Sequence, residues 1–164
     1  MKIQNQLKPA LISYWMIKAF KTFYPDIAIL PCADAPNTWK ELQKFKGCKV
    51  IPVFNGNCEN TIYQKPNDNI IFRAWHDSIH LEYGLSFKPV DEKKVGLIHC
   101  QQLRAIGAPT HVINAIYFDV VGQVEYYSLI GEFLSNQVAF VQECMEKGLQ
   151  KTISLYCNPV SLDC

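Results

Sequence analysis

Proline and glycine residues divide the second half of the chain into segments of helical length, and this division constrains the fold more than any other feature. Each segment starts beside a residue that favours a helix start and stops at a glycine. Apolar residues recur every three or four positions in between, which indicates amphipathic helices. Short loops between them indicate antiparallel neighbours, so residues 68–148 are predicted to form an antiparallel helical core. The predicted helices span residues 68–84, 89–106, 110–130 and 136–147, with Asp68 and Ser135 as caps of the first and last.

The remaining chain has a mixed pattern and is predicted to contribute a small N-terminal portion. Apolar runs separated by turn residues indicate short strands, and those at residues 49–54 and 61–63 could pair as a hairpin. Pro52 would confine its strand to a sheet edge. The fold class is therefore predicted as mainly α (α+β), with residues 1–164 in a single domain. The further predicted elements are helices at residues 9–24 and 39–45 and strands at residues 27–30, 49–54, 61–63 and 152–156.

Charge and cysteine usage limit the partners and the compartment. The formal net charge is +1, so no basic field would attract nucleic acid. The seven cysteines are odd in number and include no Cys-x-x-Cys pair, which predicts free thiols in a reducing compartment. The N-terminus has no apolar signal core and no apolar run is long enough to span a bilayer. We therefore expect a cytoplasmic protein with no membrane partner.

Two histidines mark the candidate site. His76 and His80 are four residues apart within a predicted helix, so both imidazoles leave the same face about one turn apart. This spacing allows one helix to offer two ligands to one metal ion. The same spacing also occurs by chance, and either histidine could be structural.

A catalytic zinc site usually has three protein ligands and an open position for water. If the next helix is antiparallel, Glu92 would lie opposite His80 and His99 opposite His76. Gly96, between them, would let the two helices approach closely. We predict His76, His80 and Glu92 as ligands and His99 as a structural residue. Asp119 on the third helix is predicted as a further metal ligand or as a partner that orients a histidine.

Asp77 and Arg73 suggest the chemistry. Asp77 follows His76 where zinc peptidases of the His-Glu-x-x-His type carry a glutamate base, and its shorter side chain argues against that mechanism. His-Asp phosphohydrolases use both residues as ligands, with a distant aspartate such as Asp119, but no histidine precedes His76 to complete their pattern. Arg73 could receive a phosphate. We expect a metal-dependent hydrolase, zinc as the favoured divalent ion, Asp77 as base, and phosphoester or nucleotide substrates favoured over peptides.

Three blocks of this sequence resemble an uncharacterised bacteriophage protein family. They are the FRxxHDxxxH helix at residues 72–80 with the following Glu92, residues 119–127 with Asp119 and Gln123, and residues 131–141. The resemblance covers about residues 70–148. It implies a shared site that includes these residues, without a settled activity, in a phage-encoded protein that acts in the host cytoplasm.

The sequence also allows two other hypotheses about the function of the chain. The chain could be a phage-encoded binding protein without enzymatic activity that inhibits or redirects a host protein, with its aromatic residues (12%) at the interface. Such a protein would expose Trp15, Trp39, Tyr126 or Tyr127 and leave its histidines buried or unpaired. The histidine site could also be a closed structural metal site with four protein ligands.

Overall fold

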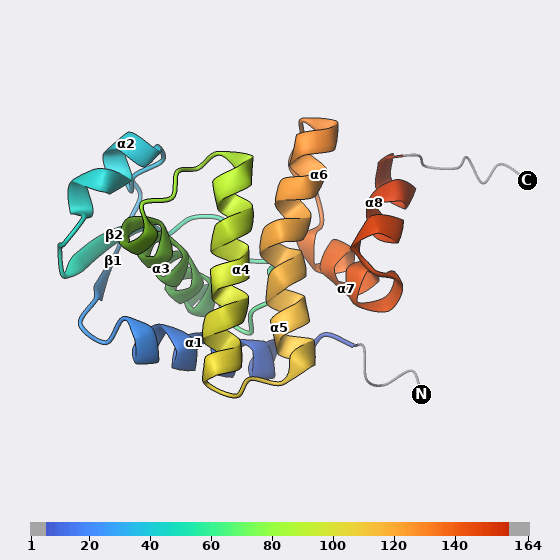
Figure 1. Ribbon diagram of the computed structural model, residues 1–164, viewed down its shortest axis with the longest axis horizontal. Coiled ribbons are helices and arrows are strands. Elements are labelled where there is room, and N and C mark those ends of the chain that lie inside the picture. The colour runs from blue at the N-terminus through green and yellow to red at the C-terminus, as the bar shows by residue number, and fades with distance from the viewer. Residues whose placement is uncertain (1–5, 158–164) are drawn as a thin grey trace, which may run out of the picture.

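The protein's structure is a computed structural model, which describes residues 6–157 of the chain. It consists of α1 (Pro9–Phe23), β1 (Ala28–Cys32), α2 (Trp39–Leu42), a 3-10 turn (Gln43–Phe45), β2 (Val50–Phe54), α3 (Pro66–Tyr83), α4 (Pro89–Ala105), α5 (Thr110–Tyr117), a π-helical segment (Phe118–Gly122), α6 (Gln123–Ile130), α7 (Gln137–Lys147) and α8 (Leu149–Cys157). Helices predominate and two short strands form a parallel sheet, which confirms the predicted mainly α (α+β) class. The sheet and α2 lie at one end of the molecule, and α7 and α8 lie at the other (Figure 1).

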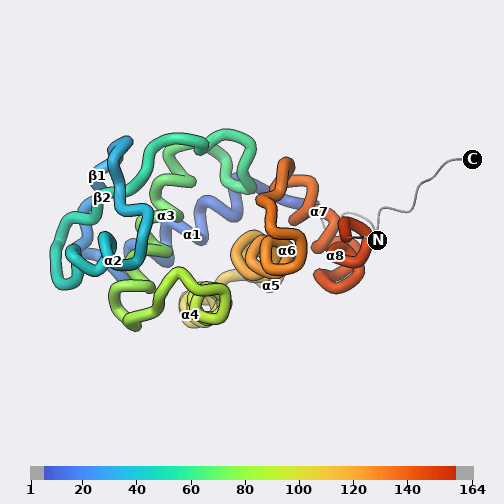
Figure 2. The backbone as a smooth tube through the Cα atoms, turned by 90° about the horizontal axis from the view of Figure 1, so that it is seen from above, coloured from blue at the N-terminus to red at the C-terminus, as the bar shows by residue number. Residues whose placement is uncertain are grey.

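The helices that carry the candidate site form the middle of the molecule. In Figure 1, α4 descends and α5 and α6 ascend beside it, as expected for antiparallel neighbours. Figure 2 shows α4, α5 and α6 end-on, with α3 and α1 beside them, toward the top of that view. α1 crosses underneath and packs against α3, α4 and α5. The segment between β2 and α3 runs along the edge at the top of Figure 2, and its residues Gly56 and Asn57 contact Arg73 of α3.

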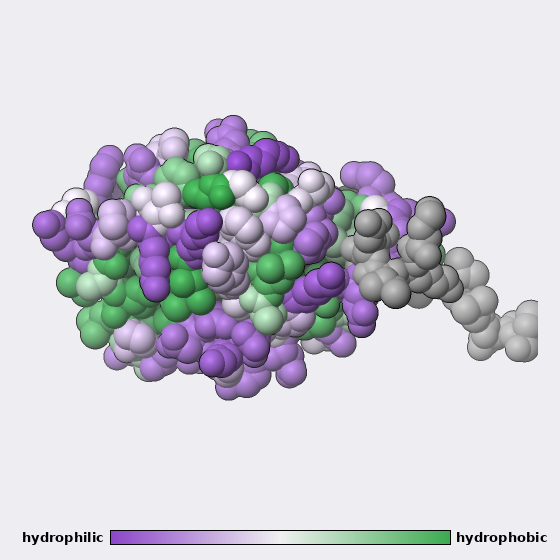
Figure 3. Space-filling model, turned by 90° about the horizontal axis from the view of Figure 1, so that it is seen from below, coloured by the Kyte–Doolittle hydropathy of each residue, from purple (hydrophilic) through white to green (hydrophobic). Residues whose placement is uncertain are grey.

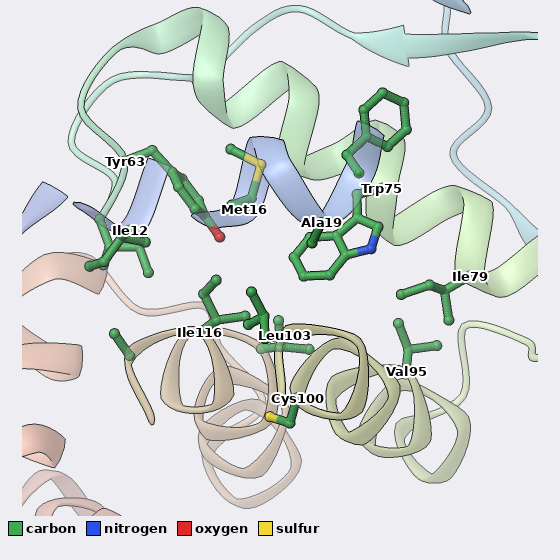
Figure 4. Packing of buried hydrophobic residues seen from close by; sticks show 14 of the residues in the cluster. Ile12, Met16, Ala19, Tyr63, Trp75, Ile79, Val95, Cys100, Leu103 and Ile116 are labelled. Atoms are coloured by element: carbon green, nitrogen blue, oxygen red, sulfur yellow. The ribbon is translucent and has the colours of Figure 1, made fainter. Parts of the chain in front are cut away.

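The hydrophobic core lies where α1, α3, α4 and α5 meet. Figure 4 shows Trp75 of α3 above Leu103 of α4 and beside Ala19 of α1, and all three side chains are fully buried. The Trp75 Nε1–H donates to Gln102 Oε1 at 2.6 Å, and Gln102 Nε2 donates to the Tyr24 hydroxyl at 3.2 Å. These hydrogen bonds link α3 to α4. They also give each of these buried polar atoms a partner, so the contact leaves none of them unsatisfied.

The N-terminal region pairs differently from the prediction. β1 and β2 form a parallel pair, with Ala28 opposite Val50 and Cys32 opposite Phe54, and α2 lies in the connection between them. Residues 61–63 form no strand, so the predicted hairpin is wrong. Both strands of a two-stranded sheet are edges, which is why Pro52 is accommodated. Local turn signals suggested the hairpin, but packing against α3 favours the crossover.

Two predicted helix caps and one predicted strand are also wrong. α3 begins at Pro66, and Asp68 accepts from the Lys65 backbone N–H at 3.2 Å from inside the first turn rather than as the N-cap. Asn136, not Ser135, caps α7, because its side chain accepts from the Ala139 N–H. Residues 152–156 lie in helix α8 instead of a strand. Their apolar residues follow a helical period that buries one face, which outweighs the strand preference of the β-branched side chains.

The surface carries apolar patches outside the candidate site. Seen from below, apolar side chains gather toward the end that holds the sheet (Figure 3), where Leu30 and Val50 are exposed. The six cysteines within residues 6–157 are free thiols, as predicted, and the seventh lies outside the described residues. Across these same residues, no helix combines the length and apolarity that crossing a membrane requires.

Candidate metal centre

α3 places its site residues on one face, as the spacing predicted. The helix starts at Pro66 and ends at Gly84, which has a positive φ of 65° and closes the helix in the left-handed conformation. The chain then reverses into α4. This short connection brings Glu92, in the first turn of α4, opposite His76 and His80.

His76, His80 and Glu92 form a compact cluster. His76 Nε2 lies 3.1 Å from Glu92 Oε2, His80 Nε2 lies 3.0 Å from His76 Nε2, and His80 Nε2 lies 3.4 Å from Glu92 Oε1. Ligands about 2.0–2.2 Å from a zinc ion lie about 2.8–3.6 Å apart at angles between 90° and tetrahedral. The three observed separations fall in this range, so the cluster could hold a metal ion with little movement.

A backbone contact fixes the tautomer of His80. Its Nδ1 lies 2.9 Å from the carbonyl oxygen of Leu85, which can only accept, so Nδ1 carries the proton. Nε2 of His80 is therefore the atom that faces the cluster and that could bind a metal ion. The His80 ring is fully buried and packs against Phe87 and Trp39, at ring-centroid distances of 5.0 and 6.3 Å. Trp39 belongs to α2, so the N-terminal portion supports the site directly.

His99 belongs to the site more closely than the sequence indicated. It is fully buried, and its Nε2 lies 3.1 Å from Nδ1 of His76 on the side away from Glu92. Its ring stacks on His76 at 5.3 Å and meets Trp75 edge to face at 4.0 Å. The seven-residue spacing from Glu92 placed His99 within reach, but only the packing shows that it contacts a candidate ligand.

The charges in the cluster support one another. Burial alone would raise the pKa of Glu92, but its hydrogen bonds to His76 and His80 and their charges hold that pKa well below its usual range. Burial would lower the pKa of His76, and the hydrogen bond and charge of Glu92 raise it above its usual value instead. Burial, with the charges of His76 and His80, lowers the pKa of His99, which is therefore neutral.

Asp77 lies beside the cluster without a fixed partner. Within the described part of the chain, no hydrogen bond or ion pair engages its carboxylate, and burial raises its pKa to about 6. A buried carboxylate with a pKa near the working pH suits a general base. Asp77 lines both pockets at the cluster, and its role as the base stays a prediction.

Asp119 reaches the same region from the π-helical segment, which interrupts the otherwise correctly predicted helix at residues 110–130. It accepts from Gln123 Nε2 at 2.9 Å and from the Tyr63 hydroxyl at 3.3 Å. Burial raises its pKa to about 6. Among residues 6–157, Asp119 is not part of the group whose ligand atoms converge. The sequence pattern predicts a strand at Tyr63, and no local signal indicates that its hydroxyl contacts Asp119.

Arg73 supports a loop rather than standing free. Its Nη1 donates to the carbonyl oxygens of Phe54 and Gly56 at 2.8 and 2.7 Å, and its Nη2 donates to that of Asn57 at 2.9 Å. Its guanidinium therefore holds the end of β2 and the segment that follows it. The predicted capture of a phosphate by Arg73 gains no support from these contacts.

Gly96 permits a close approach, but to a different element from the one predicted. A Cβ atom at Gly96 would lie 2.5 Å from Val121 Cγ2 and 3.2 Å from Val120 Cγ1. The missing side chain therefore accommodates the π-helical segment and not α3. By this contact Gly96 sets the distance between the helix of Glu92 and the segment of Asp119.

Two pockets meet at the cluster. One, of about 310 Å³, is lined by Phe72, Arg73 and Asp119 among others, and the second, of about 430 Å³, is lined by Phe87, Tyr127 and Phe133 among others. Both are lined by the same four central residues: His76, Asp77, Glu92 and Gln123. The cluster is therefore open to small molecules, in contrast to a closed structural metal site. A larger hollow of about 960 Å³ lies between β1, β2 and α2, away from the histidines.

Comparisons with known proteins returned no relative, since no protein family, curated protein or solved structure matches the chain. The resemblance to the bacteriophage family therefore stays a prediction, and the case for the site rests on its geometry.

Proposed function

We propose that the protein is a metal-dependent hydrolase that holds a divalent ion, with zinc favoured, on His76, His80 and Glu92. The observation that carries the proposal is the set of three ligand separations, 3.0, 3.1 and 3.4 Å, in a cluster that two pockets reach. Two imidazoles and one carboxylate are a donor set typical of catalytic zinc.

The residues around the cluster have distinct roles in this proposal. A bound ion would act as a Lewis acid and lower the pKa of a water molecule in its open position. Asp77 would take the proton from that water, since its carboxylate has no hydrogen-bond partner among residues 6–157 and its pKa is about 6. His99 accepts the Nδ1–H of His76 and so keeps the His76 Nε2 lone pair directed at the cluster.

The contacts of the histidines favour this function over a binding protein without activity. That alternative expects histidines that are buried or unpaired. His80 is buried, but it contacts His76 and Glu92, and His76 and Glu92 line two pockets, which a metal site would require. Tyr127 is exposed, as a binding surface would require, but it lines the pocket beside His76. The free cysteines fit the cytoplasm, which is the host's if the chain is phage-encoded.

Elemental analysis by plasma mass spectrometry tests the metal. We expect about one equivalent of a divalent ion in the wild type and none in the double variant His76→Ala/His80→Ala. The control is His111→Ala, which removes a histidine that lines neither pocket. Absence of metal from the wild type after addition of divalent ions would contradict the proposal.

Loss of activity without loss of metal tests the base. Asp77→Asn should keep the metal content of the wild type while hydrolysis slows by about 10²–10⁴-fold. The assay is the release of nitrophenol or nitroaniline from ester, amide and phosphate substrates. Unchanged hydrolysis by Asp77→Asn would assign the base to another residue.

A further inference from the structure

The two pockets at the candidate metal centre differ in chemical character. The acidic pocket, as we call the one of about 310 Å³, extends from the cluster to Asp119 and Gln123. The apolar pocket, of about 430 Å³, extends to Phe87, Tyr127 and Phe133. A substrate bound across His76 and Glu92 would reach into both, so its two ends must differ as the pockets do.

The acidic pocket has more negative than positive charge. Asp77, Glu92 and Asp119 line it, whereas its one basic side chain other than His76 is Arg73, which is engaged by three carbonyl oxygens. A phosphate dianion there would meet three carboxylates. A group that donates hydrogen bonds, above all an ammonium, would be complementary.

Asp119 is the carboxylate best placed to receive such a group. Tyr63 and Gln123 each donate one hydrogen bond to it, one on each oxygen, so its orientation is fixed and lone pairs remain on both atoms. It lies in the π-helical segment, a local geometry frequent at functional sites.

The apolar pocket offers aromatic rings to the other end of the substrate. Tyr127 and Phe133 stack on each other with ring centroids 4.7 Å apart, and Phe87, which packs against His80, lines the same pocket. Phe133 is 80% exposed and Tyr127 is 41% exposed. Exposed rings beside a buried polar cluster are the arrangement expected of a binding site for an apolar group.

We propose that the substrate has a carbonyl bond to be cleaved, such as an amide, with an ammonium group on one side of it and an apolar group on the other. This substrate replaces the phosphoester expected from the sequence, because the pocket is acidic. The ammonium binds Asp119, the apolar group lies against Tyr127 and Phe133, and the amide lies at His76, His80 and Glu92. This proposal rests on the proposed function. In the reaction, the water oxygen bonds to the carbonyl carbon, the C–N bond breaks, and the proton taken by Asp77 passes to the leaving nitrogen.

Three probes that share one aromatic group test this assignment. Glycine p-nitroanilide carries the ammonium, N-acetylglycine p-nitroanilide lacks it, and p-nitrophenyl phosphate replaces it with an anion. Their dissociation constants are measured by calorimetry on both metal-free and zinc-loaded protein, at a pH where the glycine amine is protonated. We expect the ammonium probe to bind about 10–100-fold more tightly than the acetylated one in both forms.

Variants locate the two ends of the probe. Asp119→Asn should abolish the preference for the ammonium, whereas Glu132→Gln, which removes an exposed carboxylate outside both pockets, should keep it. Phe133→Ala should weaken both anilides about 3–10-fold. Its control is Leu129→Ala, an exposed apolar residue that lines neither pocket. The wild-type comparison and Phe133→Ala involve no buried substitution, so they decide the question even if Asp119→Asn does not fold.

The outcomes separate this inference from the function beneath it. Equal binding of the two anilides, or preferred binding and hydrolysis of the phosphate, overturns the substrate class while a metal-loaded hydrolase stands. Absence of metal from the protein overturns the hydrolase, and the metal-free titrations still report whether the cleft selects an ammonium.

Discussion

His99 Nε2 lies 3.1 Å from His76 Nδ1, on the opposite side of the His76 ring from Glu92. With a metal on His76 Nε2, the proton of that ring must be on Nδ1, and His99 is the group that accepts it. The proton of neutral His99 is then on its own Nδ1, for which the described residues provide no partner. A buried donor without a partner destabilises the fold, so the contact of His99 with His76 is better explained by the site than by stability.

Replacement of His99 should weaken the metal site without dismantling the core. His99→Phe keeps a flat ring against Trp75 and Phe72 but removes the acceptor for His76. We expect metal affinity to fall about 10–100-fold, as for other partners that orient ligands. Competition with a chromogenic chelator measures it, and His111→Phe is the matched control. Equal affinities for His99→Phe and the wild type would show that the contact with His76 is incidental.

Asp77 should make the metal-free protein less stable as the pH rises. Its pKa is raised from 3.8 to about 6 in the folded state, so its contribution is fully present below pH 3.8 and is lost as the pH rises through 6. The change corresponds to at most about 3 kcal/mol. In urea unfolding with chelator present, Asp77→Asn should match the wild type near pH 4 and exceed its stability above pH 6. A constant difference across this range would contradict the assignment.

A methyl group at Gly96 should disturb the packing of α4 on the π-helical segment. Gly96→Ala would place its Cβ 2.5 Å from Val121 Cγ2, and Val121 is itself buried. Overpacking of this kind costs about 1–3 kcal/mol, more than the helix preference of alanine returns. Thermal unfolding measures the loss, and Gly96→Ser should be at least as destabilising. Stabilisation by Gly96→Ala would mean that the two segments separate easily.

Arg73 should prove to be a structural residue of the loop after β2. Arg73→Gln removes hydrogen bonds to Phe54, Gly56 and Asn57. We expect a loss of about 1–3 kcal/mol in stability, with metal affinity within about twofold of the wild type because none of the ligands contacts Arg73. Urea unfolding measures the stability, and chelator competition measures the metal affinity. A stable variant that loses only phosphate hydrolysis would restore the catalytic role predicted from the sequence.

The sequence was informative where local periodicity decides the geometry. The four-residue spacing of His76 and His80, and the short turn that sets Glu92 opposite them, depend only on helix geometry and loop length. The partner of Asp119 could not be predicted in this way, because Tyr63 is distant in sequence and reaches it through the tertiary fold. The parallel pairing of β1 and β2 could not be predicted for the same reason. A turn signal indicates only how the two segments that flank it pair, and β1 lies farther away along the chain.

The π-helical segment between α5 and α6 also determines which side chains of α6 face the cleft. A π turn holds one more residue than an α turn, so deletion of a single residue within Phe118–Gly122 would restore an unbroken α-helix. All of α6 would then rotate by about 100° relative to α5. Gln123, Val124 and Tyr127 would leave the pockets that they line. The residues that line the cleft thus depend on the rotation of α6, which the deletion of one residue from the π-helical segment would change.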